Sequence, residues 1–143
     1  MTALFPHAST IATACVCLGI RKAARLVTKR YDDAFRPLNI TSGQFSILAA
    51  MLRDDPAPLG ALADALGMDR TTLTRNLKPL IASGLVAEAE DEADRRVRGL
   101  LLTAAGRDLM IRALDVWEKV QDATLARLKD GWPSLKRQLT DLD

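Results

Sequence analysis

The sequence has too few histidines and cysteines for the commoner metal and disulfide sites. Its 143 residues include one histidine, His7, and two cysteines, Cys15 and Cys17. A single histidine has no companion ligands for a metal and no partners for a nucleophilic triad, and two cysteines at this spacing do not form a disulfide framework. We therefore expect no metal, no cofactor and no disulfide-stapled secreted fold.

The chain also lacks long apolar runs and catalytic motifs. No apolar stretch approaches the ~18 residues that a membrane span requires, and the N-terminus has no basic segment followed by an apolar core and a cleavage site. These absences predict a cytoplasmic protein with no membrane contact. Because there is no nucleophile elbow, glycine-rich phosphate loop or paired-histidine zinc motif, we do not expect an enzyme.

The composition is that of one globular domain spanning residues 1–143, with 48% hydrophobic and 27% charged residues. A net charge of +2 does not by itself indicate a nucleic-acid partner. The location of the charges is more informative, because the acidic residues gather at 54–55, at 88–94 and at the C-terminus. Residues 70–78 are left basic.

A helix, a tight break and a second helix are predicted over residues 59–82. The first helix has apolar residues at i, i+3, i+4 and i+7, namely Leu59, Leu62, Ala63 and Leu66. Gly67 is suited to end it, since glycine enters the left-handed conformation freely. Asp69 is suited to cap the second helix by accepting from free backbone N–H groups.

The second predicted helix has an apolar face suited to packing in a core and a neighbouring face of cationic and hydroxyl side chains. The core face is expected to hold Leu73, Leu77, Leu80 and Ile81. The neighbouring face carries Thr71, Thr74, Arg75 and Lys78, with Arg70 at its edge. Arginine and lysine bind guanine edges and phosphates, and threonine can contact a base, a phosphate or a thymine methyl. A face without carboxylates favours DNA recognition over simple solvation, although a solvated face is the alternative.

A charged hairpin follows this helix. Residues 85–87 and 100–102 have the pattern of two strands, and Arg95, Arg96 and Arg98 lie near the tip between them. Arginines at the tip of a two-stranded wing can enter the minor groove, where narrow A·T-rich sequence concentrates negative potential. An ordinary charged loop is the alternative, and the preceding helix favours the wing.

These segments together resemble the winged helix-turn-helix of the MarR family of transcription regulators, and the resemblance extends over residues 15–128. The wing matches the family pattern D-x-R-x-x-x-x-x-L-T at Asp94, Arg96, Leu102 and Thr103. The resemblance implies that Arg96 contacts the minor groove and that Asp94 orients it through an ion pair. It also implies that the recognition helix places six residues at the major groove, namely Arg70, Thr71, Thr72, Thr74, Arg75 and Lys78.

Long amphipathic helices are expected on both sides of this module. One is predicted over residues 9–36, after a loose leader, and another from residue 104 to about 129, followed by a short terminal helix. The compact module of residues 41–103, which begins with a capping box at Thr41 and Gln44, cannot cover all of their apolar faces. We therefore predict that 9–36 and 104–143 are dimerisation helices of a homodimer, as the family resemblance also implies.

Two ways of controlling DNA binding are considered. The segment from Cys17 to Thr41 resembles the organic-hydroperoxide-sensing branch of the family. There Cys17 falls on the reactive cysteine and Tyr31 on a tyrosine that hydrogen-bonds it, while Arg21 replaces a second tyrosine. This makes Cys17 and Tyr31 a candidate redox sensor. The alternative is that both cysteines are small apolar residues in the dimer core.

The other form of control is a small effector. The family resemblance implies an aromatic, often anionic ligand between the dimerisation helices and the DNA-binding module. The sequence offers Phe45, Met51 and Arg25 as cavity residues, although such residues are equally consistent with a filled core.

The sequence thus predicts a mainly α fold with a small β wing, in which a winged helix-turn-helix is flanked by dimerisation helices. The predicted function is that of a transcriptional regulator, a repressor in this interpretation, which binds a pseudo-palindromic site in double-stranded DNA as a homodimer. Release would follow ligand binding or cysteine oxidation. The alternative is a dimeric winged-helix interaction module that binds a protein or small molecule without DNA.

Overall fold

The computed structural model describes residues 5–90 and 98–142. Helices α1 (Phe5–Ala14) and α2 (Val16–Phe35) lead through a short 3-10 turn, η1 (Arg36–Leu38), into α3 (Ser42–Ala50). Strand β1 (Ala57–Pro58), helices α4 (Leu59–Leu66) and α5 (Arg70–Ala82), and strands β2 (Val86–Glu90) and β3 (Arg98–Leu102) follow. Helices α6 (Ala104–Leu125) and α7 (Gly131–Thr140) complete the described chain. The fold is mainly α with a small antiparallel sheet, as predicted.

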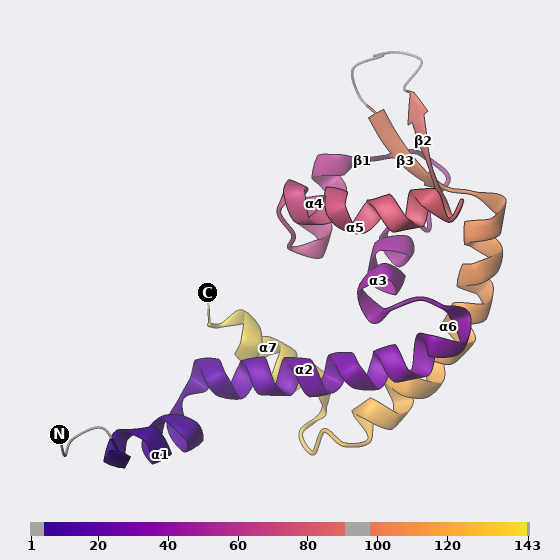
Figure 1. Cartoon of the computed structure of the whole chain (residues 1–143). Coiled ribbons are helices and arrows are strands. Elements are labelled where there is room, and N and C mark those ends of the chain that lie inside the picture. The colour runs from indigo at the N-terminus through magenta and orange to yellow at the C-terminus, as the bar shows by residue number, and fades with distance from the viewer. Residues whose placement is uncertain (1–4, 91–97, 143) are drawn as a thin grey trace.

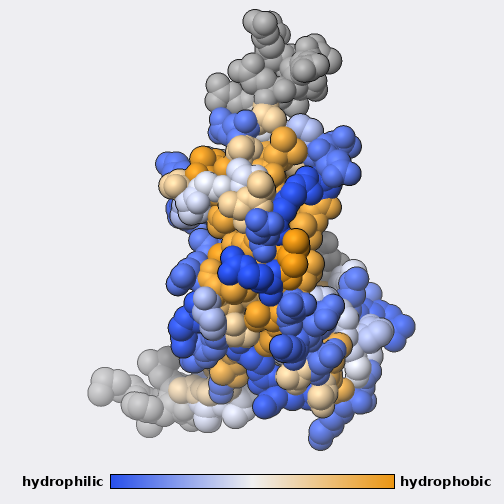
Figure 2. Space-filling model, turned by 90° about the vertical axis from the view of Figure 1, so that its right-hand side faces the viewer, coloured by the Kyte–Doolittle hydropathy of each residue, from blue (hydrophilic) through white to orange (hydrophobic). Residues whose placement is uncertain are grey.

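The molecule has two parts, which Figure 1 shows one above the other. We call residues 41–103 the winged-helix module and α1, α2 and α7 the helical base. Helix α6 descends from the module along one side and packs against α2. Figure 2 looks at the side on which α6 lies and shows hydrophobic residues along the middle of that face, with hydrophilic residues on either side. No helix in the described part of the chain is long and apolar enough to span a membrane.

The core lies where α2, α3 and α6 meet the module. Phe35 at the end of α2 is fully buried and stacks on Phe45 of α3, with ring centroids 4.6 Å apart. The carboxylate of Asp32 accepts a hydrogen bond of 2.7 Å from the backbone N–H of Ser42, which fixes α3 against the end of α2. The predicted capping box is confirmed, since Thr41 and Gln44 each accept from the other's backbone N–H.

Thr103 joins the module to α6. Its hydroxyl oxygen accepts from the backbone N–H of Gly106 at 3.0 Å and donates to the carbonyl of Gly84 at 2.6 Å. Its own N–H donates to the carbonyl of Leu85 at 3.1 Å. Thr103 therefore caps α6 and connects the start of that helix by hydrogen bonds to the turn between α5 and β2.

The sheet has one strand more than the sequence predicted. β3 lies between β1 and β2 and is antiparallel to both, with Val86 opposite Leu102 and Ala57 opposite Leu100. No strand was predicted at residues 57–58, because two paired residues are too few to produce an alternating pattern. Pro58 fits this place because a proline is tolerated in an edge strand.

The predicted helix 9–36 is wrong in its continuity. The structure has two helices instead, and α1 already begins at Phe5, within the expected leader. Cys15 is extended (φ −73°, ψ 112°) and caps α2, because its Sγ accepts from the backbone N–H of Leu18 at 3.5 Å. The helix after the wing also ends sooner, at Leu125 rather than near Lys129, where turn hydrogen bonds replace the helical ones.

Candidate nucleic-acid interface

Helix α5 is held in place by an apolar face and an acidic cap. Leu73, Leu77 and Leu80 are at most 3% exposed and anchor it to the core, as predicted. Gly67 ends α4 with φ 61°, which confirms the predicted break between the two helices. Ile81 was expected in the core but is 37% exposed. Ile81 thus lies at the border of the buried face, beside Leu80, which stays in the core, and periodicity alone does not place that border.

The predicted cap of α5 is also confirmed. The carboxylate of Asp69 accepts from the backbone N–H of Thr72 at 2.8 Å and from its hydroxyl at 2.7 Å. These two bonds lower the pKa of Asp69 from its ordinary value of 3.8, since both favour the ionised form. Because the hydroxyl of Thr72 donates to Asp69, Thr72 serves the cap and is less available to DNA than the other predicted residues.

The outer face of α5 carries the remaining predicted recognition residues. Arg70, Thr71, Thr74, Arg75 and Lys78 are all exposed. Among the residues that the structure describes, none of the three cations forms an ion pair, and no aspartate or glutamate lies within 70–82. The helix therefore presents cations and short hydroxyls that no internal carboxylate neutralises.

The wing is built on the confirmed hairpin of β2 and β3, which stands at the end of the module next to α5. Arg98 is the first residue of β3, and its backbone pairs with that of Glu90. Asp94, Arg95 and Arg96 lie in residues 91–97, outside the described residues. The placement of the wing arginines in the minor groove and the ion pair between Asp94 and Arg96 stay predictions.

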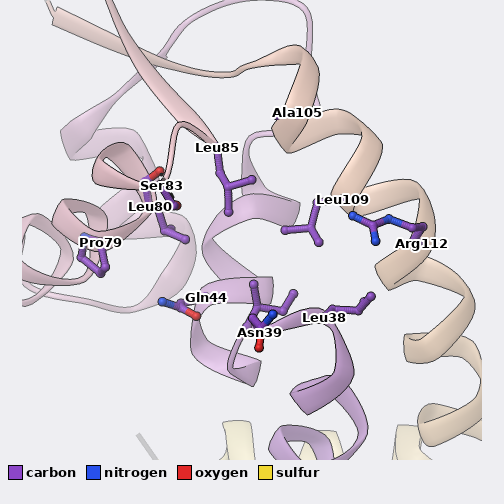
Figure 3. A pocket seen from close by; sticks show the side chains of 11 residues that line it. Leu38, Asn39, Gln44, Pro79, Leu80, Ser83, Leu85, Ala105, Leu109 and Arg112 are labelled. Atoms are coloured by element: carbon purple, nitrogen blue, oxygen red, sulfur yellow. Dashed lines mark hydrogen bonds between the residues drawn. The ribbon is translucent and has the colours of Figure 1, made fainter.

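A hollow of about 420 Å³ lies between the module and α6. Figure 3 shows it between the C-terminal end of α5 on one side and Leu109 and Arg112 of α6 on the other, with Gln44 and Asn39 below. Its walls are mainly apolar and include Leu38, Ile40, Leu80, Leu85 and Leu109. No sequence pattern marks this site, because four separate segments contribute to it.

The cavity residues suggested by the sequence do not line that hollow. Phe45 and Met51 are 8% and 1% exposed and belong to the filled core. Arg25 lies on the exposed face of α2, beside a different, shallower hollow. Size and residue type alone could not separate core positions from cavity positions.

The structure does not bring Cys17 and Tyr31 together within one chain. Both are on α2, about 21 Å apart along its axis for a rise of roughly 1.5 Å per residue. The Tyr31 hydroxyl donates to Oε1 of Gln121 on α6 instead. Both cysteines are exposed, and no group of three potential metal ligands occurs among the described residues.

Several large apolar residues of the helical base are exposed. On α1 and α2 they are Ile11, Val16, Leu18, Ile20, Leu26 and Val27, with exposures from 39% to 65%. Trp132 and Leu139 of α7 are 43% and 41% exposed. The base therefore has apolar surface that this chain does not cover.

Comparisons with known proteins agree with this architecture. The profile of the MarR family matches residues 38–97. An organic hydroperoxide resistance transcriptional regulator of Bacillus subtilis is 29% identical over 101 residues, which are 71% of this chain and 69% of that protein. A MarR mutant from E. coli complexed with operator DNA has the same fold, with a TM-score of 0.82 over 93% of this chain and 96% of that one, at 20% identity.

The structure of the M. tuberculosis transcriptional regulator MosR in complex with DNA is similar in both sequence and fold. It is 38% identical, with a TM-score of 0.79 over 90% of this chain and 92% of that one. These relatives are regulators rather than enzymes. A similarity that extends over nine-tenths of the chain, together with the match to the family profile, shows that this protein belongs to the MarR family of DNA-binding transcriptional regulators.

Proposed function

We propose that the protein is a repressor that binds a pseudo-palindromic operator as a homodimer. The observation that carries this proposal is the exposed face of α5, on which Arg70, Arg75 and Lys78 have no ion-pair partner among the described residues. In this arrangement α5 lies in the major groove and contacts bases and phosphates. Arg96 and its neighbours on the wing enter the adjacent minor groove.

The uncovered apolar surface of the helical base supports the homodimer. Burying apolar area is worth about 25 cal/mol per Å², so a second copy that covers α1, α2 and α7 is strongly favoured. Two-fold pairing would present two copies of α5 to successive major grooves about 34 Å apart. The operator is then expected to have matching half-sites.

The 420 Å³ hollow supports release by a small effector. Its apolar walls suit an aromatic ring, and the guanidinium of Arg112 suits a carboxylate. A ligand there would contact Pro79, Leu80 and Ser83 at the end of α5. It could thereby alter the direction of the recognition helix relative to α6.

The helix break at Cys15 supports release by oxidation. On one continuous helix Cys15 and Cys17 would point about 200° apart and could not easily form a disulfide, but Cys15 is not helical. Oxidation at Cys15 or Cys17 would disturb the start of α2 in the dimer region. The position of Tyr31 requires that any tyrosine contact with Cys17 come from the second copy.

Selection of duplexes from a random pool tests the proposed function. A pseudo-palindrome should be enriched, and its affinity should fall by about 10³–10⁵ between 50 and 200 mM salt if ~6–10 phosphates are contacted. Repeating the selection with benzoate or a hydroperoxide would identify the form of release. A flat salt dependence without sequence preference would instead support an interaction module that does not bind DNA.

A further inference from the structure

The guanidinium group of Arg70 lies on the neighbouring helix α4. A Cβ built on Gly60 would be 2.8 Å from Nη2 of Arg70, 3.5 Å from its Cζ and 3.7 Å from its Nε. Three guanidinium atoms therefore lie within 4 Å of the place that a Cβ of residue 60 would take. The Arg70 side chain makes no hydrogen bond or ion pair with any residue that the structure describes, so its packing on α4 is the contact that positions its charged group.

The backbone of Gly60 does not require glycine. Gly60 is the second residue of α4, where glycine lowers helix stability relative to alanine. Its backbone does not have the positive φ found at Gly67, so alanine could adopt the same conformation. What distinguishes Gly60 from Gly43, the second residue of α3, is that Arg70 occupies the space that a Cβ would take.

We infer that Gly60 is a positioning residue for DNA binding, which lets the Arg70 guanidinium pack against α4 at the edge of the recognition face. This inference rests on the proposed function, in which Arg70 contacts DNA. An arginine already held in one orientation loses less conformational freedom when it binds a phosphate or a base. Gly60 acts only through Arg70 and makes no contact with DNA itself.

Alanine at position 60 should move Arg70 and leave the fold intact. A 2.8 Å approach is too close for a Cβ, but the atom it meets is the far end of a flexible side chain. The guanidinium can therefore swing away without strain in the backbone. Since alanine favours the helix, Gly60→Ala should be at least as resistant to urea as the wild type.

Gly43 offers a matched control. It is the second residue of α3, as Gly60 is of α4, and a Cβ there would meet only Oγ1 of Thr41, at 3.9 Å. The probe is a fluorescent duplex enriched by the wild type, with affinity measured by anisotropy. We expect Arg70→Ala to weaken binding by about 10-fold and Gly60→Ala by about 3-fold to 10-fold, whereas Gly43→Ala binds normally.

The double variant Gly60→Ala/Arg70→Ala distinguishes positioning from a direct effect. If Gly60 acts through Arg70, the double variant binds as Arg70→Ala does. Additive losses, or a Gly60→Ala protein that binds as tightly as the wild type, would overturn the inference. In the free protein the NMR signal of the Arg70 Nε–H group should shift in Gly60→Ala and stay in place in Gly43→Ala.

That NMR signal also separates this inference from the proposed function. If the wild type binds no duplex in a salt-dependent manner, the proposed function fails whatever the spectrum shows. An unshifted Arg70 signal in Gly60→Ala refutes the packing of Arg70 on α4 even if DNA binding is normal.

Discussion

The winged-helix module and the helical base differ in how well each covers its own apolar residues. In the module, α5 buries Leu73, Leu77 and Leu80 almost completely and presents cations and hydroxyls outward. In the base, Ile11 and Val16 are 56% and 65% exposed. The module thus buries the apolar face of α5 within the chain, whereas the base leaves large apolar residues exposed, which the proposed second copy would cover.

The largest expected effect comes from the base. Ile11→Glu places a charge on the surface proposed to pair with a second copy, so the dimer should dissociate. Loss of the second recognition helix should then reduce operator affinity by about 10²–10⁴. Analytical ultracentrifugation and anisotropy would measure the two effects. Leu52→Glu is the control, since Leu52 is also exposed (46%) but lies in the winged-helix module; equal dissociation in both variants would argue against the assigned interface.

On the module side, Arg75→Ala should weaken operator binding while leaving the dimer intact. Each lost arginine contact is worth about 1–3 kcal/mol, so a drop in operator affinity of about 10-fold or more is expected.

Arg96→Ala should reduce affinity mainly for sites with A·T-rich flanks. Arg127→Ala, in the turn after α6, is the control. Normal gel-shift affinity in both Arg75→Ala and Arg96→Ala would refute the proposed DNA contacts.

A smaller effect is expected at the joint between module and α6. Thr103→Ala removes the cap of α6 and the bond to the Gly84 carbonyl, which should lower the free energy of unfolding by about 1–2 kcal/mol. Urea denaturation at fixed protein concentration measures this change. Thr103→Ser keeps the hydroxyl and should retain most of the stability; a serine variant as unstable as the alanine variant would show that the methyl group matters instead.

The smallest effect is the response of α5 to acid. Because the pKa of Asp69 is lowered in the folded protein, the stabilisation by its cap is complete above about pH 4. It is lost as the pH falls through the lowered pKa. Asp69→Asn keeps a capping oxygen that does not titrate, so its urea midpoint should fall less steeply with acid than that of the wild type. Parallel curves would contradict this role of Asp69.

Features set by neighbouring residues were predicted well. The capping box at Thr41, the end of α4 at Gly67 and the cap at Asp69 each depend on residues within four positions, and the structure confirms all three. The exposed face of α5 was predicted because helical periodicity separates it from the leucine face. The DNA contacts of that face and of Arg96 stay predictions.

Features set by distant segments were predicted poorly. The hollow beside Arg112 combines residues from η1, α3, α5 and α6, and the exposure of Ile81 depends on which segments pack against the end of α5. Cys15 looked like one more helical residue, yet the chain changes direction there and its thiol caps the next helix.

The amino-acid sequence by itself determined where α4 and α5 begin and end and which side of α5 is charged, because caps and helical periodicity act over one or two turns. Only the tertiary structure decided which side chains fill the core, which line the hollow and what Arg70 rests upon. Those outcomes depend on which remote segments meet, and packing between remote segments leaves no local pattern in the chain.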